Sequence, residues 1–210
     1  MQTKKEHIKG LLVEAATREF IKYGYAQSSL RRIVKSINVS TGTFYTYFKD
    51  KDDIFEFIVS PWTQVFDKLI YNSSNDPVLI EFHKTQNAEI IYRNYANVLE
   101  EMLNNKIPAY IYLLRSEGSK YHNQAQKDID KSVDSIYDIF SKEIFIYEDN
   151  SFIDKFFLKN FYNYFLHFMI NVLQNNIPLD EAKHKLKDMV TFMSEGWIGL
   201  QEAKALKKVN

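Results

Sequence analysis

The stretch from Ser40 to Tyr47 places small hydroxyl side chains and phenols close together. Threonines offer a hydroxyl and a methyl group, which suit base edges, and tyrosine phenols can reach phosphate oxygens. Glycine permits the close approach of a helix to another surface. The candidate residues are Ser40, Gly42, Thr43, Tyr45, Thr46 and Tyr47. Their chemistry suits a helix end pressed into the major groove of a nucleic acid.

Covalent and metal chemistry find little support in the sequence. The chain has no cysteine, which excludes disulfides, thiolate zinc sites and cysteine nucleophiles together. His184 shares a helical stripe with Asp180 and Asp188, but lysines interleave with them, so a solvated face is favoured over a metal site. There is no glycine-rich phosphate loop and no nucleophile elbow. We expect no catalytic residue, no metal and no cofactor.

Two short helices and a turn must position the hydroxyl-rich stretch. The pattern predicts a helix of about two turns capped by Ser40, with Phe44 and Phe48 on its inner face. A preceding short helix ends at the turn Ile37-Asn38-Val39, whose middle position needs the left-handed backbone that asparagine tolerates better than most residues. This layout is that of a helix-turn-helix.

Charge is distributed unevenly along the chain. The net charge is zero, yet residues 1 to 51 contain ten lysines and arginines against four acids, a balance of +6, which leaves −6 for the rest. A basic segment at one end of an acidic chain fits phosphate binding at that end only.

The segment GYAQSSLRRIVKSINVSTGTFYTYFKDKDDI, residues 24 to 54, resembles the DNA-binding signature of the TetR family of transcriptional regulators. The resemblance covers about the first 55 residues. It implies that Ser28 or Ser29, together with Arg31, contacts phosphates and that Thr43 and its neighbours read bases. It also implies that Tyr45, Tyr47 and Lys51 hold the DNA backbone.

Two positions depart from the family pattern. Val34 stands where alanine is preferred, and Thr41 stands where lysine is common. The second departure removes one phosphate contact, although Thr41 stays within the expected DNA-binding surface. Both affect affinity and its salt dependence rather than the fold.

The whole chain is expected to be all-α, because glycine and proline are few and apolar residues recur at spacings of three and four. About nine helices are predicted, the later ones over 78–103, 108–117, 122–146 and 151–174 and after Pro178. Ser151 and Asp154 form a capping box at the start of one of them. We expect a helix-turn-helix DNA-binding domain over 1–50 and a ligand-binding and dimerisation domain over 51–210.

The family resemblance implies a homodimer held by the last two helices and a ligand pocket among the helices before them. The helix over 151–174 is apolar on most sides, and Gly196 and Gly199 around Trp197 would let another helix come close. Phenols and aromatic rings suggest a pocket for a small hydrophobic effector. Arg115 is expected either to pair with an acid near the end of its helix, which is the favoured interpretation, or to anchor an anionic or carbonyl group of the effector. The candidate ligand residues are Tyr92, Tyr95, Tyr110, Tyr112, Arg115, Phe161, Tyr164, Phe165 and Phe168.

These expectations describe a ligand-responsive regulator that binds palindromic double-stranded operator DNA and more readily represses than activates. No stretch has the length and apolar character of a signal peptide or a membrane span, so a cytoplasmic protein without a membrane partner is expected. Two alternatives keep the fold without operator binding. One is a helical regulator that binds proteins, and the other is a helical enzyme.

Overall fold

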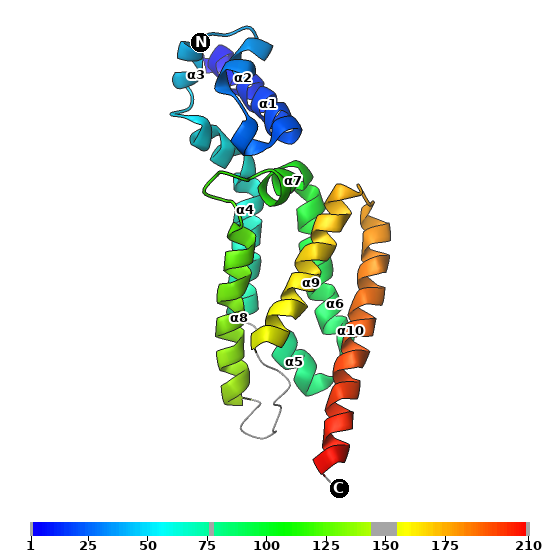
Figure 1. The fold of residues 1–210 in the computed structure, drawn as a ribbon. Coiled ribbons are helices and arrows are strands. Elements are labelled where there is room, and N and C mark those ends of the chain that lie inside the picture. The colour runs from blue at the N-terminus through cyan, green and yellow to red at the C-terminus, as the bar shows by residue number, and fades with distance from the viewer. Residues whose placement is uncertain (1, 76–77, 144–154, 209–210) are drawn as a thin grey trace. The chain divides into compact units, whose positions relative to one another are not determined.

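The computed structural model describes residues 2–75, 78–143 and 155–208, and every regular element within them is a helix (Figure 1). The helices are α1 (Gln2–Gln27), α2 (Leu30–Ser36), α3 (Thr41–Tyr45), α4 (Lys51–Asn75), α5 (Val78–Thr85), α6 (Ala88–Asn104), α7 (Lys106–Leu114), α8 (Gln124–Glu143), α9 (Lys155–Gln174) and α10 (Leu179–Lys208). The all-α prediction is confirmed.

The helix predicted over 78–103 is two helices, α5 and α6. Gln86 has a left-handed backbone with φ of 56°, which ends α5. Asn87 then caps α6, because its side-chain oxygen accepts a hydrogen bond from the backbone N–H of Glu89 at 3.1 Å. The apolar periodicity continues across the break, so spacing alone did not reveal it.

The other helices lie within a few residues of their predicted ranges. The helix predicted over 108–117 is α7, and those over 122–146 and 151–174 correspond to α8 and α9. Residues 144–146, and the capping box of Ser151 and Asp154, lie outside the described residues.

The described chain forms two compact units that do not follow the expected boundary at residue 50. The first unit consists of Met1–Val65 and Asn105–Ala125, and the second of Phe66–Asn104 and Gln126–Asn210. The first unit extends past residue 50 because the start of α4 packs on α1, as the 5.0 Å separation of the Phe20 and Phe55 ring centroids shows. It also includes α7 and the segment after it, because the Tyr25 N–H near the end of α1 donates to the Arg115 carbonyl at 2.8 Å.

The first unit has a core of side chains drawn from α1, α2, α4 and the α3 region. Burying each of the larger ones stabilises the fold by roughly 1.5–3 kcal/mol. These residues are Leu12, Ala16, Phe20, Ile33, Phe44, Phe48, Ile54, Phe55 and Ile58. The core therefore fixes α2, α3 and the turn between them, which position the hydroxyl-rich stretch.

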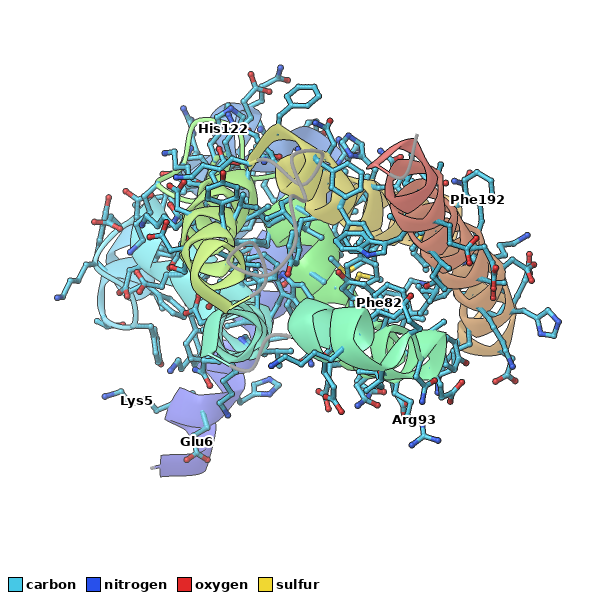
Figure 2. The ribbon with its side chains drawn as sticks, turned by 90° about the horizontal axis from the view of Figure 1, so that it is seen from below. Lys5, Glu6, Phe82, Arg93, His122 and Phe192 are labelled. Carbon is cyan, nitrogen blue, oxygen red and sulfur yellow. The ribbon has the colours of Figure 1, made fainter. Side chains whose placement is uncertain are left out.

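In the second unit, part of the core lies between α5, α6, α9 and α10. Phe82 of α5 points into it and packs edge to face on Trp197 of α10, with ring centroids 6.1 Å apart. Phe192 of the same α10 instead stands at the outer surface of the helix and is 79 % exposed (Figure 2). Helix α10 thus carries one apolar side chain inward and another outward.

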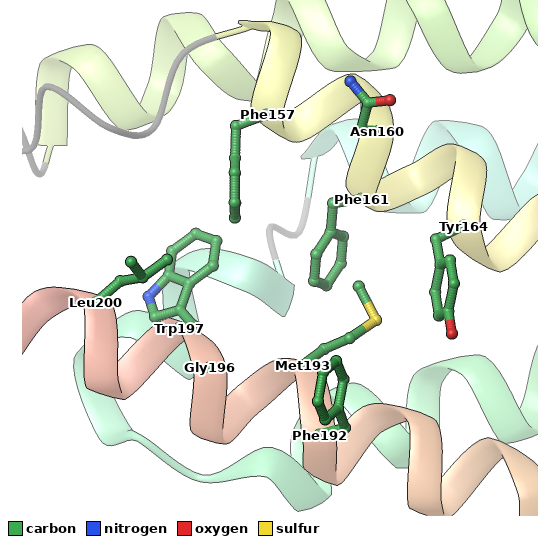
Figure 3. Close-up of a pocket in the computed structure, with 9 residues that line it drawn as sticks. All are labelled: Phe157, Asn160, Phe161, Tyr164, Phe192, Met193, Gly196, Trp197 and Leu200. Atoms are coloured by element: carbon green, nitrogen blue, oxygen red, sulfur yellow. The ribbon is translucent and has the colours of Figure 1, made fainter.

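An open groove of about 520 Å³ runs between α9 and α10 (Figure 3). Its lining is apolar except for one amide and one phenol. The lining residues are Phe157, Asn160, Phe161, Tyr164, Phe192, Met193, Gly196, Trp197 and Leu200. Beside it a second, more polar hollow of about 440 Å³ shares Tyr164 and includes His167 and Lys185. The two last helices therefore present an apolar surface to the outside.

Candidate nucleic-acid interface

The turn between α2 and α3 has the expected left-handed residue. Asn38 has φ of 57°, and its N–H donates to the Lys35 carbonyl at 3.2 Å. The next N–H, of Val39, donates to the Val34 carbonyl at 3.1 Å. These bonds close α2 and set the direction in which the chain enters α3, so the predicted turn is confirmed.

Helix α3 and the turn that follows it bury two phenylalanines and present most of their polar residues, as predicted. Phe44 is fully buried and Phe48 is 4 % exposed, whereas Tyr45 is 56 % exposed. Thr43 and Tyr47 are half-buried, and the remaining candidates of this stretch are exposed: Ser40, Thr41, Gly42 and Thr46. The buried rings anchor the segment, which leaves one continuous outer face of small polar groups.

Ser40 caps α3 and organises the hydroxyls near its start. Its Oγ accepts the Thr43 N–H at 3.0 Å and lies 2.9 Å from Thr43 Oγ1. One turn later, the Thr46 hydroxyl donates to the Thr43 carbonyl at 2.6 Å. The threonine hydroxyls are thereby oriented, and each keeps a lone pair that can accept a bond from outside.

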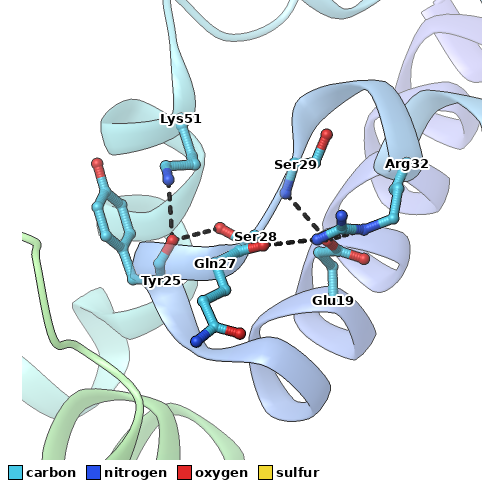
Figure 4. Close-up of polar contacts among 7 residues, drawn as sticks. All are labelled: Glu19, Tyr25, Gln27, Ser28, Ser29, Arg32 and Lys51. Carbon is cyan, nitrogen blue, oxygen red and sulfur yellow. Dashed lines mark hydrogen bonds and ion pairs between the residues drawn. The ribbon is translucent and has the colours of Figure 1, made fainter.

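Glu19 of α1 holds the start of α2 (Figure 4). Its carboxylate, on a residue only 8 % exposed, accepts the Ser29 N–H at 2.9 Å and pairs with Arg32 at 2.6 Å. Arg32 also donates to the Gln27 carbonyl at 2.6 Å. The Arg32 side chain is therefore bonded within the protein. Its neighbour Arg31 is exposed, as a phosphate-binding residue must be.

Ser28 and Ser29 differ in how their side chains are used. The Ser28 hydroxyl donates to the Tyr25 carbonyl at 2.6 Å. Ser29 is the N-cap residue of α2, yet its side chain makes no capping bond. The Ser28 hydroxyl is thus bonded within the protein, whereas the Ser29 side chain does not cap α2.

Lys51 has a partner within the protein that sequence reasoning missed. Its ammonium donates to the Tyr25 carbonyl at 2.8 Å and lies 4.0 Å from the centroid of the Tyr25 ring (Figure 4). Partial burial lowers the pKa of this lysine. Lys51 thus braces the kink near the C-terminal end of α1. A bound phosphate would have to share the Lys51 ammonium with the Tyr25 carbonyl.

Tyr25 joins three parts of the first unit. Its N–H donates to the Arg115 carbonyl at 2.8 Å, its hydroxyl donates to Asp52, and its ring packs on Phe55 at 5.0 Å. Gly24, with φ of 71°, turns the chain so that Tyr25 can reach these partners. The sequence signal for this turn is the glycine itself, which adopts a left-handed backbone freely but does not indicate the partners of Tyr25.

Three candidate ligand residues belong to the first unit. Arg115 donates to the Tyr110 hydroxyl at 2.9 Å, and its carbonyl holds Tyr25. Tyr112 is buried, and its ring lies edge-on to Tyr121 at 5.8 Å. The expectation that Arg115 pairs with an acid or anchors a ligand missed this packing, because no spacing links residue 115 to residue 25.

The other six candidate ligand residues lie in the second unit, and three of them stack on one another there. Tyr95 stacks on Phe165 with centroids 4.0 Å apart, and Phe165 stacks in turn on Phe168 at 6.4 Å. Burial raises the pKa of Tyr95 well above its ordinary value. Phe161 and Tyr164 line the α9–α10 groove instead, and Tyr92 is half-buried on α6.

The short α2, the left-handed turn at Asn38 and the capped α3 with its polar outer face define a helix-turn-helix protein. Residues 12–58 match the family described as bacterial regulatory proteins, tetR family. The resemblance of this segment to the TetR family, seen in the sequence, is confirmed.

Relatives with curated names are helix-turn-helix transcriptional regulators. The HTH-type transcriptional regulator YhgD of Bacillus subtilis is 42 % identical over 48 residues, a match spanning 23 % of this chain and only 25 % of that protein. YuxN, another HTH-type transcriptional regulator of the same bacterium, is 27 % identical over 212 residues, 93 % of this chain and 69 % of that protein.

Solved structures share the fold over most of the chain. NalD of Pseudomonas aeruginosa, the secondary repressor of the MexAB-OprM multidrug efflux pump, has a TM-score of 0.54 at 16 % identity, covering 90 % of this chain and 96 % of its own. A transcriptional regulator of Aquifex aeolicus has a TM-score of 0.53 at 20 % identity, covering 88 % and 98 %. These likenesses extend the fold beyond the helix-turn-helix.

Membrane spans and clustered metal ligands are both absent from the described residues. None of the described helices is both long and apolar enough to cross a membrane. Within the same residues, no group of three or more histidine, aspartate or glutamate side chains is arranged to hold a metal ion.

Proposed function

We propose that this protein is a transcriptional regulator that binds double-stranded operator DNA through α2 and α3 and is released by a small hydrophobic effector. The outer face of α3 is the observation that carries the proposal. It has small polar groups and an exposed tyrosine, while the phenylalanines that anchor the helix are buried. A helix end of this kind fits the major groove. Repression in the cytoplasm is the proposed mode, by analogy with NalD, which is a repressor.

The proposed DNA contacts divide into two groups. Thr43 and Thr46, with the close approach that Gly42 permits, read base edges. The remaining residues bind the sugar-phosphate backbone and fix the position of the helix. They are Ser28 or Ser29, Arg31, Ser40, Thr41, Tyr45, Tyr47 and Lys51.

The proposed assembly is a homodimer formed by α9 and α10. Phe156 and Phe192 are 75 % and 79 % exposed on these helices, and the groove between the helices is apolar. A second copy covering the same surface would remove these side chains from water. A twofold protein requires a palindromic operator, with half-sites about one helical turn, roughly 34–36 Å, apart.

The proposed effector binds the aromatic residues of the second unit. Tyr92, Tyr95, Phe165 and Phe168 on α6 and α9 offer apolar faces with two phenols as orienting groups. An effector lowers DNA affinity only if it binds the DNA-incompetent conformation more tightly than the competent one.

A gel shift with genomic fragments tests DNA binding, and Gly42→Gln provides the matched variant. A Cβ at position 42 would make only ordinary contact, 3.6 Å from Ser40 Oγ, so the variant is expected to fold. Its side chain would stand between α3 and the groove, so specific binding should be lost while the melting temperature stays unchanged. If the wild type retained no fragment against excess competitor DNA, the proposed function would be wrong.

A further inference from the structure

A second group of cations lies outside the helix-turn-helix, on the first turns of α1. Lys4 and Lys5 are exposed, and Lys9 follows one turn after Lys5 on the same side of the helix. Glu6 is the one acid among residues 4 to 9, which leaves this short segment with a net charge of +2. Figure 2 shows Lys5 and Glu6 on the first turns of α1.

Lys9 fixes this end of α1 beside the end of the recognition segment. Its ammonium lies 4.2 Å from the centroid of the Phe57 ring and 5.7 Å from that of Phe48. Phe48 is the buried residue that follows α3, and Phe57 is 45 % exposed on α4. Four residues of helix are about 6 Å, so Lys5 lies one turn beyond this contact along α1.

The acids of the first unit do not neutralise these lysines. Glu14 pairs with Arg18, Glu19 with Arg32 and Glu56 with Lys120. At the start of α4, Asp53 accepts the Lys49 N–H and Asp50 accepts the Asp53 N–H. Within the part of the chain that the structure describes, neither Lys4 nor Lys5 forms an ion pair.

We propose that Lys4 and Lys5 bind phosphates that flank each half-site, so that the DNA-binding surface continues from α3 onto the start of α1. The inference rests on the proposed operator binding and extends it. Two observations indicate that these lysines bind the same DNA duplex as α3. The lysines carry charge complementary to phosphate, and Lys9 holds their helix next to the segment that enters the groove. Contacts of this kind add affinity without adding sequence preference.

The test compares the wild type with a Lys4→Gln/Lys5→Gln variant on DNA selected by the wild type from random sequence. Affinity is measured against salt on two duplexes, one extending about one helical turn, roughly 10 bp, beyond each half-site and one trimmed at the half-sites. The quantity compared is the slope of the logarithm of the association constant against the logarithm of the salt concentration. On the long duplex, the magnitude of this slope should fall by about 0.9 for each phosphate that the variant no longer neutralises. On the trimmed duplex, the two proteins should have equal slopes.

The matched control is Lys127→Gln/Lys131→Gln, which removes two exposed lysines from α8 in the second unit. It should leave both slopes unchanged. Equal slopes for wild type and the Lys4/Lys5 variant on the long duplex would overturn the inference while operator binding stood. An equal fall in the control would also overturn it, because net charge alone would then explain the effect. A wild type that selects no DNA would instead overturn operator binding itself.

Discussion

Thr43 occupies the first turn of α3, where its methyl group and oriented hydroxyl can meet base edges. Thr43→Ala should therefore relax preference at one base pair of each half-site, with a loss of discrimination on the order of 1–3 kcal/mol. Binding-site selection measures this. Thr41→Ala, two residues earlier and also exposed, is the matched control and should leave the selected sequence unchanged. If Thr43→Ala selected the wild-type sequence, the placement of the recognition helix would be wrong.

Lys51 is expected to act on the DNA backbone and on the protein at once. Lys51→Ala should weaken binding to all DNA sequences alike. It should also reduce, by about one unit, the slope of the logarithm of the association constant against the logarithm of the salt concentration. It should also lower the melting temperature, because the Tyr25 carbonyl loses the bond it accepts at 2.8 Å. Selection and thermal unfolding together check this. A changed sequence preference in this variant would contradict the assignment.

Tyr25 should make the stability of the protein sensitive to alkaline pH. Burial and the hydrogen bond to Asp52 raise the pKa of its phenol above the ordinary value of 10.0. The unfolded chain ionises first as the pH rises through that value, so the free energy of unfolding should fall above it. Tyr25→Phe cannot ionise, and its unfolding free energy should fall less between about pH 9 and 11. Tyr95 keeps its raised pKa in both proteins, so the difference isolates Tyr25. Parallel pH curves would contradict this account.

At the scale of elements, the segment after α7 braces the turn at the end of α1. Gly118 has φ of 83°, and a Cβ there would lie 3.2 Å from Ala26 Cβ. Gly118→Ala combines backbone strain with crowding and should destabilise the first unit by about 1–2 kcal/mol. Gly10→Ala is the matched control with the opposite expected sign. A Cβ at position 10 of α1 meets nothing within 4 Å, so this variant should stabilise the protein by about 0.5–1 kcal/mol. Urea unfolding of both variants checks the signs. A Gly118→Ala protein as stable as Gly10→Ala would contradict the brace.

The helices that could be predicted from the sequence are those whose local signals agree. Asn38 in the turn, Ser40 as cap and Phe44 with Phe48 one turn apart all indicate the same structure, and the protein adopts it. The division of 78–103 into two helices was missed because a left-handed Gln86 carries no strong residue preference.

Contacts between distant segments could not be predicted in this way. Arg115 bonds to Tyr25 across ninety positions through a backbone carbonyl, which any residue type provides. Lys51 matched a family pattern for phosphate binding, and that match gave no sign of its bond to Tyr25. Residue types therefore indicated what each group can do, and packing decided which neighbour it meets.

For the whole molecule, the apolar surface of α9 and α10 predicts the assembly. Phe192→Lys places a charge on the groove and should shift the protein from dimer to monomer at micromolar concentration. Thr191→Lys adds the same charge to the neighbouring exposed position, which does not line the groove, and should leave the dimer intact. Sedimentation velocity distinguishes the two. A monomeric wild type, or equal effects of both variants, would contradict dimerisation through this surface.

The central claim is that a dimer presents two copies of α3 to DNA, and it is tested most directly by selecting bound sequences from random duplexes and footprinting the selected DNA. We predict an enriched palindrome whose half-sites lie about one helical turn apart, roughly 34–36 Å, with protection symmetric about its dyad. Enrichment of no sequence, or a footprint without dyad symmetry, would contradict it.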